Sequence, residues 1–169
     1  MAISPDSKVD KLKMFKKIKL IACSLVMLAA VLFAGCAAGL QESGPAEENM
    51  VMYIKIGEES AAMRLALSDA ARELKDRLAE GDIVYTADDY GGFEKVGELG
   101  FSLPRTDTHI SVVPGDVVLY LGNNIAMYYG RNAWSFTPLG RIEGLSQAEL
   151  ESFLQAGGGP VRITFSLSR

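Results

Sequence analysis

Two short apolar runs near the middle of the chain constrain its fold more than any other feature. They lie in GDVVLYLGNNIAMYYG, residues 115–130, where 117–121 and 125–129 carry apolar side chains at successive positions instead of every second one. Strands of this kind are buried on both faces. The GNN sequence at 122–124 separates the runs, and Asn tolerates the positive φ angles of tight hairpin turns. We therefore expect a hairpin that runs through the middle of the structure.

Alternating patterns predict further strands on both sides of this hairpin. MVMYIKIG (50–57) and AAMRLAL (61–67) alternate around a polar turn, as the two strands of a half-buried hairpin would. The expected buried face of the second strand comprises Met63, Leu65 and Leu67. The segment from Val161 to Ser168 alternates most clearly of all, with an apolar residue at every second position.

Two helices are expected between these strands. Residues 69–80 place apolar side chains on one stripe and charged side chains on the other. Ser146 and Glu149 have the spacing of a capping box at the start of a second helix, and the glycines at 157–159 are expected to end it. Many strands with two short helices favour a mainly β fold. A small closed or half-closed barrel satisfies this pattern, because closure removes free strand edges.

The N-terminal segment has the composition of an export signal. Five lysines between Lys11 and Lys19 precede an uncharged stretch from Leu20 to Gly35, so residues 1–35 are interpreted as a signal peptide. Translation from Met14 would give a complete signal by itself. The alternative is an uncleaved membrane anchor, because the uncharged stretch continues to Leu40. Both interpretations place the following domain outside the membrane.

Cys36 ends this apolar stretch in the sequence FAGC. FAGC resembles the lipobox of bacterial lipoproteins, in which small residues precede a cysteine that receives a diacylglycerol. The resemblance implies that Cys36 carries lipid and holds the chain at the cell envelope on the extracytoplasmic side. Cys23 would leave with the signal, so the mature chain could form no internal disulfide.

The remainder of the chain divides into a tether and one domain. Residues 36–49 are mostly small, polar or acidic after the cysteine and are expected to form a flexible linker. Residues 50–169 are expected to form one monomeric domain. From Ala37 onward there are 11 basic and 19 acidic residues, a net charge of −8. Such a charge excludes the basic surface that nucleic-acid binding requires.

Three motifs in the domain resemble those of the cyclophilin-like family of small bacterial proteins. They are DYGGFEKVGELG (89–100), PGDVVLYLGNNIAMYYG (114–130) and FTPLGRIEG (136–144), in that order. The resemblance implies a barrel with capping helices, like that of the peptidyl-prolyl isomerases. Some members have Pro-Trp-Gly-Asn where 121–124 read Leu-Gly-Asn-Asn here, so one loop at the barrel rim is expected to differ.

Proline isomerisation requires an arginine that polarises the amide and an apolar pocket for the ring. Arg105 is the candidate arginine, and the candidate pocket walls are Met127, Tyr129, Trp134 and Phe136. The true cyclophilins carry a Phe-His-Arg stretch and a further histidine, and neither is present here. We therefore treat the same five residues as candidates for ligand binding. For Arg105 the alternative is a surface arginine in a loop, and for the aromatic residues it is core packing.

Other polar residues support no catalytic assignment. His109 is the only histidine and is expected in a loop. Asp88, Asp89, Glu94 and Glu98 lack the spacing of a calcium loop and are interpreted as solvated charge. No catalytic residue, metal ligand or cofactor is assigned.

Three functional classes follow from the sequence. The first is a tethered binding module for a peptide or small ligand, which we favour. The second is a prolyl isomerase with a degenerate active site. The third is an envelope protein that interacts through its surface and has no pocket.

Overall fold

A computed structural model describes residues 50–169 of the chain. The signal peptide at 1–35, Cys36 and the tether at 36–49 lie outside the described residues. The described strands are β1 (Val51–Ile56), β2 (Glu59–Leu65), β3 (Ile83–Tyr90), β4 (Glu94–Glu98), β5 (Thr108–Val112), β6 (Asp116–Tyr120), β7 (Asn124–Tyr128), β8 (Asn132–Ile142) and β9 (Val161–Ser166). The helices are α3 (Asp69–Leu78) and α4 (Gln147–Phe153).

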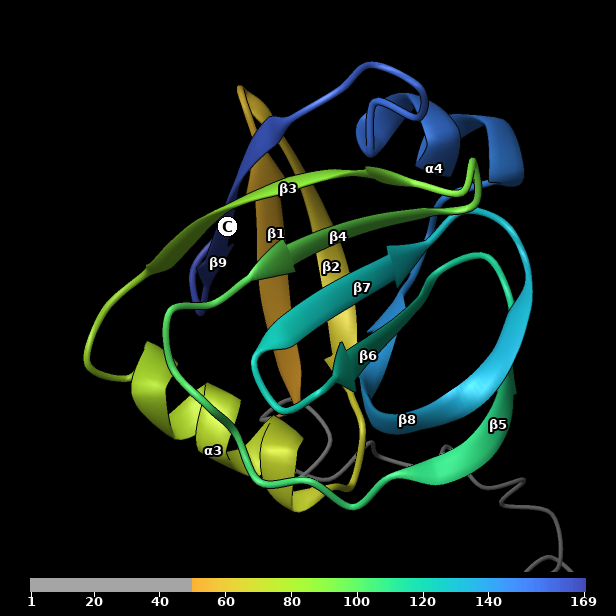
Figure 1. The fold of residues 1–169 in the computed structure, drawn as a ribbon. Coiled ribbons are helices and arrows are strands. Elements are labelled where there is room, and N and C mark those ends of the chain that lie inside the picture. The colour runs from red at the N-terminus through yellow and green to blue at the C-terminus, as the bar shows by residue number, and fades with distance from the viewer. Residues whose placement is uncertain (1–49) are drawn as a thin grey trace, which may run out of the picture. The chain divides into compact units, whose positions relative to one another are not determined.

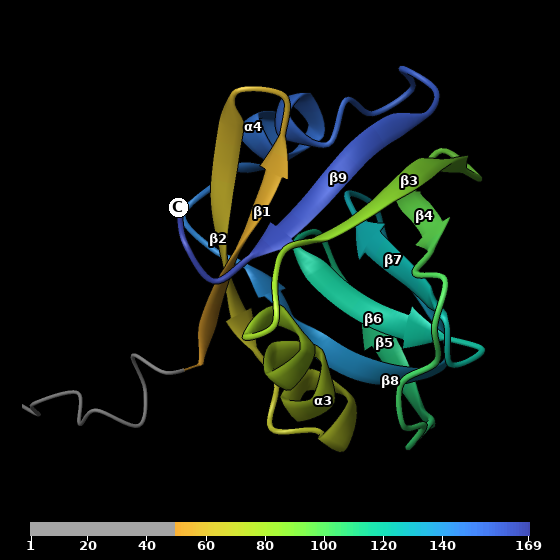
Figure 2. The ribbon, with the colours of Figure 1, turned by 90° about the vertical axis from the view of Figure 1, so that its left-hand side faces the viewer.

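Eight of these strands close into an antiparallel barrel. Their order is β2-β1-β9-β3-β4-β7-β6-β8, and β8 pairs with β2 to complete the ring. Figure 2 shows the strands curving around the interior. The ninth strand, β5, pairs with the first half of β8. The expected mainly β barrel with two helices is confirmed. Of the two expected forms, closed and half-closed, the structure has the closed one.

The two helices lie at opposite ends of the barrel (Figure 1). The helix α3 begins at Ser68, whose side chain accepts a hydrogen bond from the Ala71 amide. The predicted capping box of α4 is present between Ser146 and Glu149. Buried side chains of both helices, including Leu74 of α3 and Phe153 of α4, join the interior core. Among residues 50–169, no helix has the length and hydropathy to cross a membrane.

The central hairpin of β6 and β7 is paired on both outer edges, as the apolar runs predict. One face of each strand points into the barrel, and these residues are Val117, Leu119, Ile125 and Met127. The opposite face carries Val118, Ala126 and Tyr128, which form a second, smaller core with Val112 and Phe136. The runs are apolar on both faces because each face contacts a different core.

The second core exists because β8 bends. Its Gly140 pairs with Val117 and its Pro138 pairs with Val118, so Leu139 is an extra residue between them. A bulge of this kind bends the strand, and proline is tolerated there. The first half of β8, with β5 attached, then lies over the outer face of β6 and β7 (Figure 1).

Several local expectations are wrong in detail. Both hairpin strands begin and end one residue earlier than predicted, and the positive φ angles belong to Leu121 and Gly122 instead of the asparagines. Leu67 follows the end of β2 and is 86% exposed, because the chain turns there into α3. The helix α4 ends before the glycines at 157–159, because Gln155 already adopts a positive φ.

Candidate functional site

A pocket of about 210 Å³ lies on the outside of the barrel, between β4, β6 and β7 and the bent half of β8. Its aromatic walls and its one carboxylate are Tyr90, Glu94, Tyr120, Tyr128, Trp134 and Phe136. Val96, Ala126 and Asn132 complete the lining. Drug-sized ligands occupy pockets of about 300–1,000 Å³. This pocket therefore matches one head group or one side chain.

The register between the strands determines which residues form the floor of the pocket. Tyr90 of β3 pairs with Glu94 of β4, and Glu94 pairs with Tyr128 of β7. These three residues form one row across three strands, on the outer face of the barrel. Successive side chains in a strand point to opposite faces. The neighbouring residues Asp89 and Lys95, which also pair with each other, consequently belong to the inner side.

The aromatic side chains of the pocket contact one another. The rings of Tyr128 and Phe136 lie 5.9 Å apart, and those of Tyr120 and Phe136 lie 6.0 Å apart in an edge-to-face arrangement. Behind them, Phe93 stacks on Tyr128 with 6.2 Å between centroids. Such pairs add to the stability gained by burial and hold the rings in fixed orientations. Trp134 differs from the others because it is 57% exposed at the edge of the pocket.

Glu94 contributes the carboxyl group of this mainly aromatic pocket. Its residue is only 8% exposed, and its Oε2 atom is buried without a hydrogen-bond partner among the described residues. Burial raises the pKa of its carboxyl, and a hydrogen bond from the Tyr128 hydroxyl opposes that rise only in part. The Tyr128 hydroxyl also accepts a 3.4 Å hydrogen bond from Asn132. Within residues 50–169, the Tyr85 hydroxyl is the other buried side-chain atom of this kind, and it belongs to the barrel interior.

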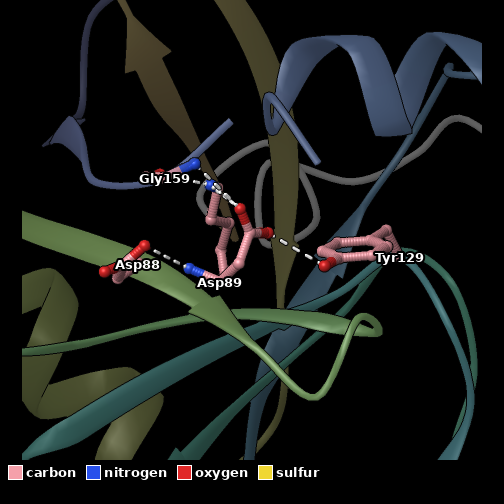
Figure 3. A network of polar contacts seen from close by, with 5 residues as sticks. Asp88, Asp89, Tyr129 and Gly159 are labelled. Carbon is pink, nitrogen blue, oxygen red and sulfur yellow. Dashed lines mark hydrogen bonds and ion pairs between the residues drawn. The ribbon is translucent and has the colours of Figure 1, made fainter. Parts of the chain in front are cut away.

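A buried ion pair lies on the inner side of the same strands. The fully buried Lys95 Nζ donates to Asp89 Oδ2 at 2.7 Å and to the Gly159 carbonyl at 2.6 Å. Asp89 also accepts from the Tyr129 hydroxyl at 2.9 Å and from the Gly159 amide at 3.1 Å. Figure 3 shows Asp89 between Tyr129 and Gly159, with Asp88 pointing away from them. This network fixes β3, β4 and β7 against the loop before β9, and thereby positions the row of pocket residues on their outer face.

The network shifts the pKa values of two of its members, Asp89 and Tyr129. Partial burial acts to raise the pKa of Asp89, but hydrogen bonds from Lys95, Tyr129 and the glycine amides outweigh it and lower the pKa to about 2. Burial, and then the adjacent Asp89 carboxylate, raise the pKa of Tyr129 to about 12. At neutral pH Asp89 is consequently a carboxylate, which forms the ion pair with Lys95, and Tyr129 is neutral.

This arrangement predicts a loss of stability in acid. The folded pKa of Asp89, about 2, lies below its ordinary value of 3.8. The ionised carboxylate therefore stabilises the fold above pH 4, and that contribution is lost as the pH falls through the interval between the two values. We expect the stability advantage of wild type over Asp89→Asn to shrink by about 2 kcal/mol between about pH 5 and pH 2. Urea unfolding at a series of pH values measures it, and an advantage independent of pH would contradict the prediction.

The structure separates the five residues proposed for ligand binding. Trp134 and Phe136 both line the pocket. Met127 is fully buried and points into the barrel, and Tyr129 belongs to the Lys95 network. Arg105 lies exposed in the loop between β4 and β5, where it pairs with Asp107.

Several site residues were missed by sequence reasoning. The interpretation of the acidic group as solvated charge is wrong for Asp89 and Glu94, because one is ion-paired and the other is covered by aromatic rings. The two glycines at 91–92 could have indicated the ion pair. If they form the turn of a hairpin, Asp89 and Lys95 lie opposite each other on its two strands. His109, expected in a loop, lies exposed in β5.

A larger, open hollow of about 620 Å³ lies beside Arg131, Arg141 and Gln147. Arg141 already pairs with Asp116 there, and the hollow contains no buried unpaired group among the described residues. No group of three or more His, Cys, Asp and Glu side chains suited to a metal ion occurs within residues 50–169.

Comparison with known proteins agrees with this architecture. A family model described as "Cyclophilin-like family" matches residues 54–166. The solution structure of a hypothetical protein from Archaeoglobus fulgidus superimposes with a TM-score of 0.53 at 17% sequence identity. That match covers 74% of this chain and 99% of the archaeal chain, and at this identity it concerns the fold alone. The search of curated proteins gave no match.

Proposed function

Because the chain belongs to the cyclophilin-like family, we propose that its barrel is a binding domain whose outer pocket takes one small ligand group at the surface of a membrane. The observation that carries the proposal is the pocket itself, in which aromatic walls surround a carboxylate with a buried, unpartnered oxygen. Leaving such an atom unpaired costs about 1–3 kcal/mol, which a ligand that supplies the missing partner would recover. Convergence of apolar walls on one polar group is typical of ligand sites.

Binding is favoured over proline isomerisation by the position of Arg105. The isomerase chemistry requires an arginine next to the proline amide, and none of the described residues that line the pocket is an arginine or a lysine. Arg105 is exposed and donates to Asp107 instead. An assay of proline isomerisation is therefore expected to give the same background rate for wild type and Arg105→Ala.

The pocket can be tested with the chain's own fluorescence. Trp134 is the only tryptophan of the chain and lies at the edge of the pocket. Compounds that raise the unfolding midpoint in a ligand screen bind the folded state. We expect such compounds also to change the emission of Trp134 in a saturable way. Ala126→Leu, which fills the pocket floor, should abolish both effects, whereas Ala133→Leu on the exposed face of β8 should leave them intact.

The same screen gives the result that contradicts a ligand pocket. Ligands that stabilise the chain but leave Trp134 unchanged, and that bind Ala126→Leu as well as wild type, would place the binding site elsewhere. The unfolding midpoint of each variant without ligand confirms that it folds. Ala126 is buried and Ala133 is exposed, so overpacking affects only the first variant, and an unchanged midpoint of Ala126→Leu without ligand shows that its loss of binding is not a loss of folding.

Anchoring at the membrane is the second part of the proposal, and it rests on the FAGC sequence at Cys36. We expect bacterial cells that express the full chain to incorporate labelled fatty acid into it, because a lipidated cysteine carries acyl chains. Cys36→Ala should remove the label completely, while Cys23→Ala, within the signal, should retain it. Labelling that persists in Cys36→Ala would contradict lipid attachment at this residue.

A further inference from the structure

We propose that the pocket recognises an organic cation, an ammonium group carried on a small apolar body. The inference rests on the proposed function, because it names the chemistry of the ligand for the same pocket. The observations behind it are the buried carboxyl group of Glu94, the aromatic rings around it and the volume of the cavity.

Glu94 supplies the negative partner. Among the described residues that line the pocket it alone has a carboxyl group, none has a basic side chain, and Glu94 is only 8% exposed. The Oε2 atom of its carboxyl is buried and has no hydrogen-bond partner among the described residues. A buried carboxylate without a counter-charge is costly, whereas one paired with a cation is stabilised.

Residues 50–169 supply no counter-charge at this place. Lys95 follows Glu94 directly but occupies the opposite face of β4, where Asp89 and the Gly159 carbonyl bind its ammonium group. Residues 50–169 contain 11 basic and 16 acidic residues, a net charge of −5. The field of the whole domain therefore also attracts cations and disfavours anionic ligands.

The rings make the pocket suitable for a bulky ammonium rather than a bare metal ion. Tyr90, Tyr120, Tyr128, Trp134 and Phe136 all line it. The faces of aromatic rings carry partial negative charge, and cages of such rings bind quaternary ammonium groups. Tyr90 and Trp134 are 64% and 57% exposed, so two of the five rings remain accessible to a ligand from solvent. The volume of about 210 Å³ admits a head group of this size.

Choline and its neutral carbon isostere, 3,3-dimethylbutan-1-ol, test the charge directly. The two probes have nearly the same shape and differ by one positive charge. We expect choline to change the emission of Trp134 in the full chain with an affinity about tenfold or more above that of the isostere. Glu94→Gln should weaken this preference, and the part that remains comes from the aromatic rings. Glu98→Gln, the same substitution farther along β4 and outside the pocket lining, should preserve it.

The pH dependence gives a second measurement that needs no variant. Choline keeps its charge at every pH, so its affinity should rise as Glu94 ionises, at a pH above the usual range of a glutamate because burial raises the pKa of Glu94. The other ionisable groups lining the pocket are the hydroxyls of Tyr90, Tyr120 and Tyr128, which carry no positive charge. His109 lies on the adjoining β5, and the isostere, titrated in parallel, controls for it.

The outcomes distinguish this inference from the proposed function. Equal affinities for choline and the isostere, or an affinity for choline that Glu94→Gln and pH leave unchanged, would overturn the cation while leaving a ligand pocket in place. Absence of any emission change with choline, the isostere and every stabilising compound would overturn both. Phosphatidylcholine vesicles mixed with Cys36→Ala chain, with and without Glu94→Gln, separate the two sources of the cation: co-sedimentation that Glu94→Gln lowers assigns a lipid headgroup, and Glu94-dependent binding to free choline alone assigns a soluble molecule.

Discussion

Lys95→Met is expected to lower the free energy of unfolding by about 3 kcal/mol. Removing one partner of a buried ion pair typically costs about 3–5 kcal/mol, because the remaining charge stays buried. We place this variant at the low end of that range. The remaining Asp89 side chain is 18% exposed and keeps its hydrogen bonds from Tyr129 and Gly159.

Urea unfolding of wild type and variant measures this effect. Arg72→Met is the matched control, because its ion pair with Asp69 is more than half exposed on both sides and should contribute less than about 0.5 kcal/mol. A loss below about 1 kcal/mol for Lys95→Met would show that the ion pair does not hold the barrel together. The network also positions Tyr90, Glu94 and Tyr128, so we expect the same variant to change the emission of Trp134.

Gly140→Ala is expected to destabilise the fold on the order of 3 kcal/mol, the upper part of the range for overpacking. Gly140 lies where β8 closes the barrel against β2, opposite Leu65. A Cβ atom there would overlap the backbone carbonyl oxygen of Arg64 and approach Met63 Cε to 2.6 Å. The backbone oxygen cannot rotate away as a side chain can, so the two strands must separate.

Hydrogen exchange locates this effect. The Ala66 amide donates to the Leu139 carbonyl beside the closure, at 2.8 Å, and should exchange faster in Gly140→Ala. Ser135→Ala, on the exposed first half of β8, should change stability by no more than about 0.5 kcal/mol. Unchanged exchange at Ala66 together with unchanged stability would mean that the closure tolerates a side chain.

The pocket depends on both of these features, although neither is part of its lining. The network on the inner face fixes the register of β3, β4 and β7, and closure with the bulge at Leu139 directs the first half of β8 over the outer face. Ligand binding is thereby coupled to the stability of the barrel. A ligand that contacts both Glu94 and Trp134 would connect the two parts that form the pocket.

Local structure was largely predictable from the sequence, because it depends on patterns within a few residues. Alternation predicts β1, β2 and β9, the capping box at Ser146 predicts the start of α4, and the two-sided apolar runs predict a central hairpin. The errors of one to three residues arise where a single backbone angle decides, as at Leu121 and Gln155. The number of strands favoured a closed or half-closed barrel, the resemblance to a family agreed with it, and only whether the barrel closes fully was left open.

The site was predictable only in part, since Trp134 and Phe136 were identified and Glu94 was not. Sequence determined that the β6–β7 hairpin would have two apolar faces, and that an acidic segment would stand beside a lysine at position 95. Only the tertiary structure decided which face of the hairpin met which core, and that Tyr90 would share a pocket with Trp134. The reason is physical: residues 44 positions apart meet only after the barrel closes and β8 bends, and no local pattern encodes that geometry.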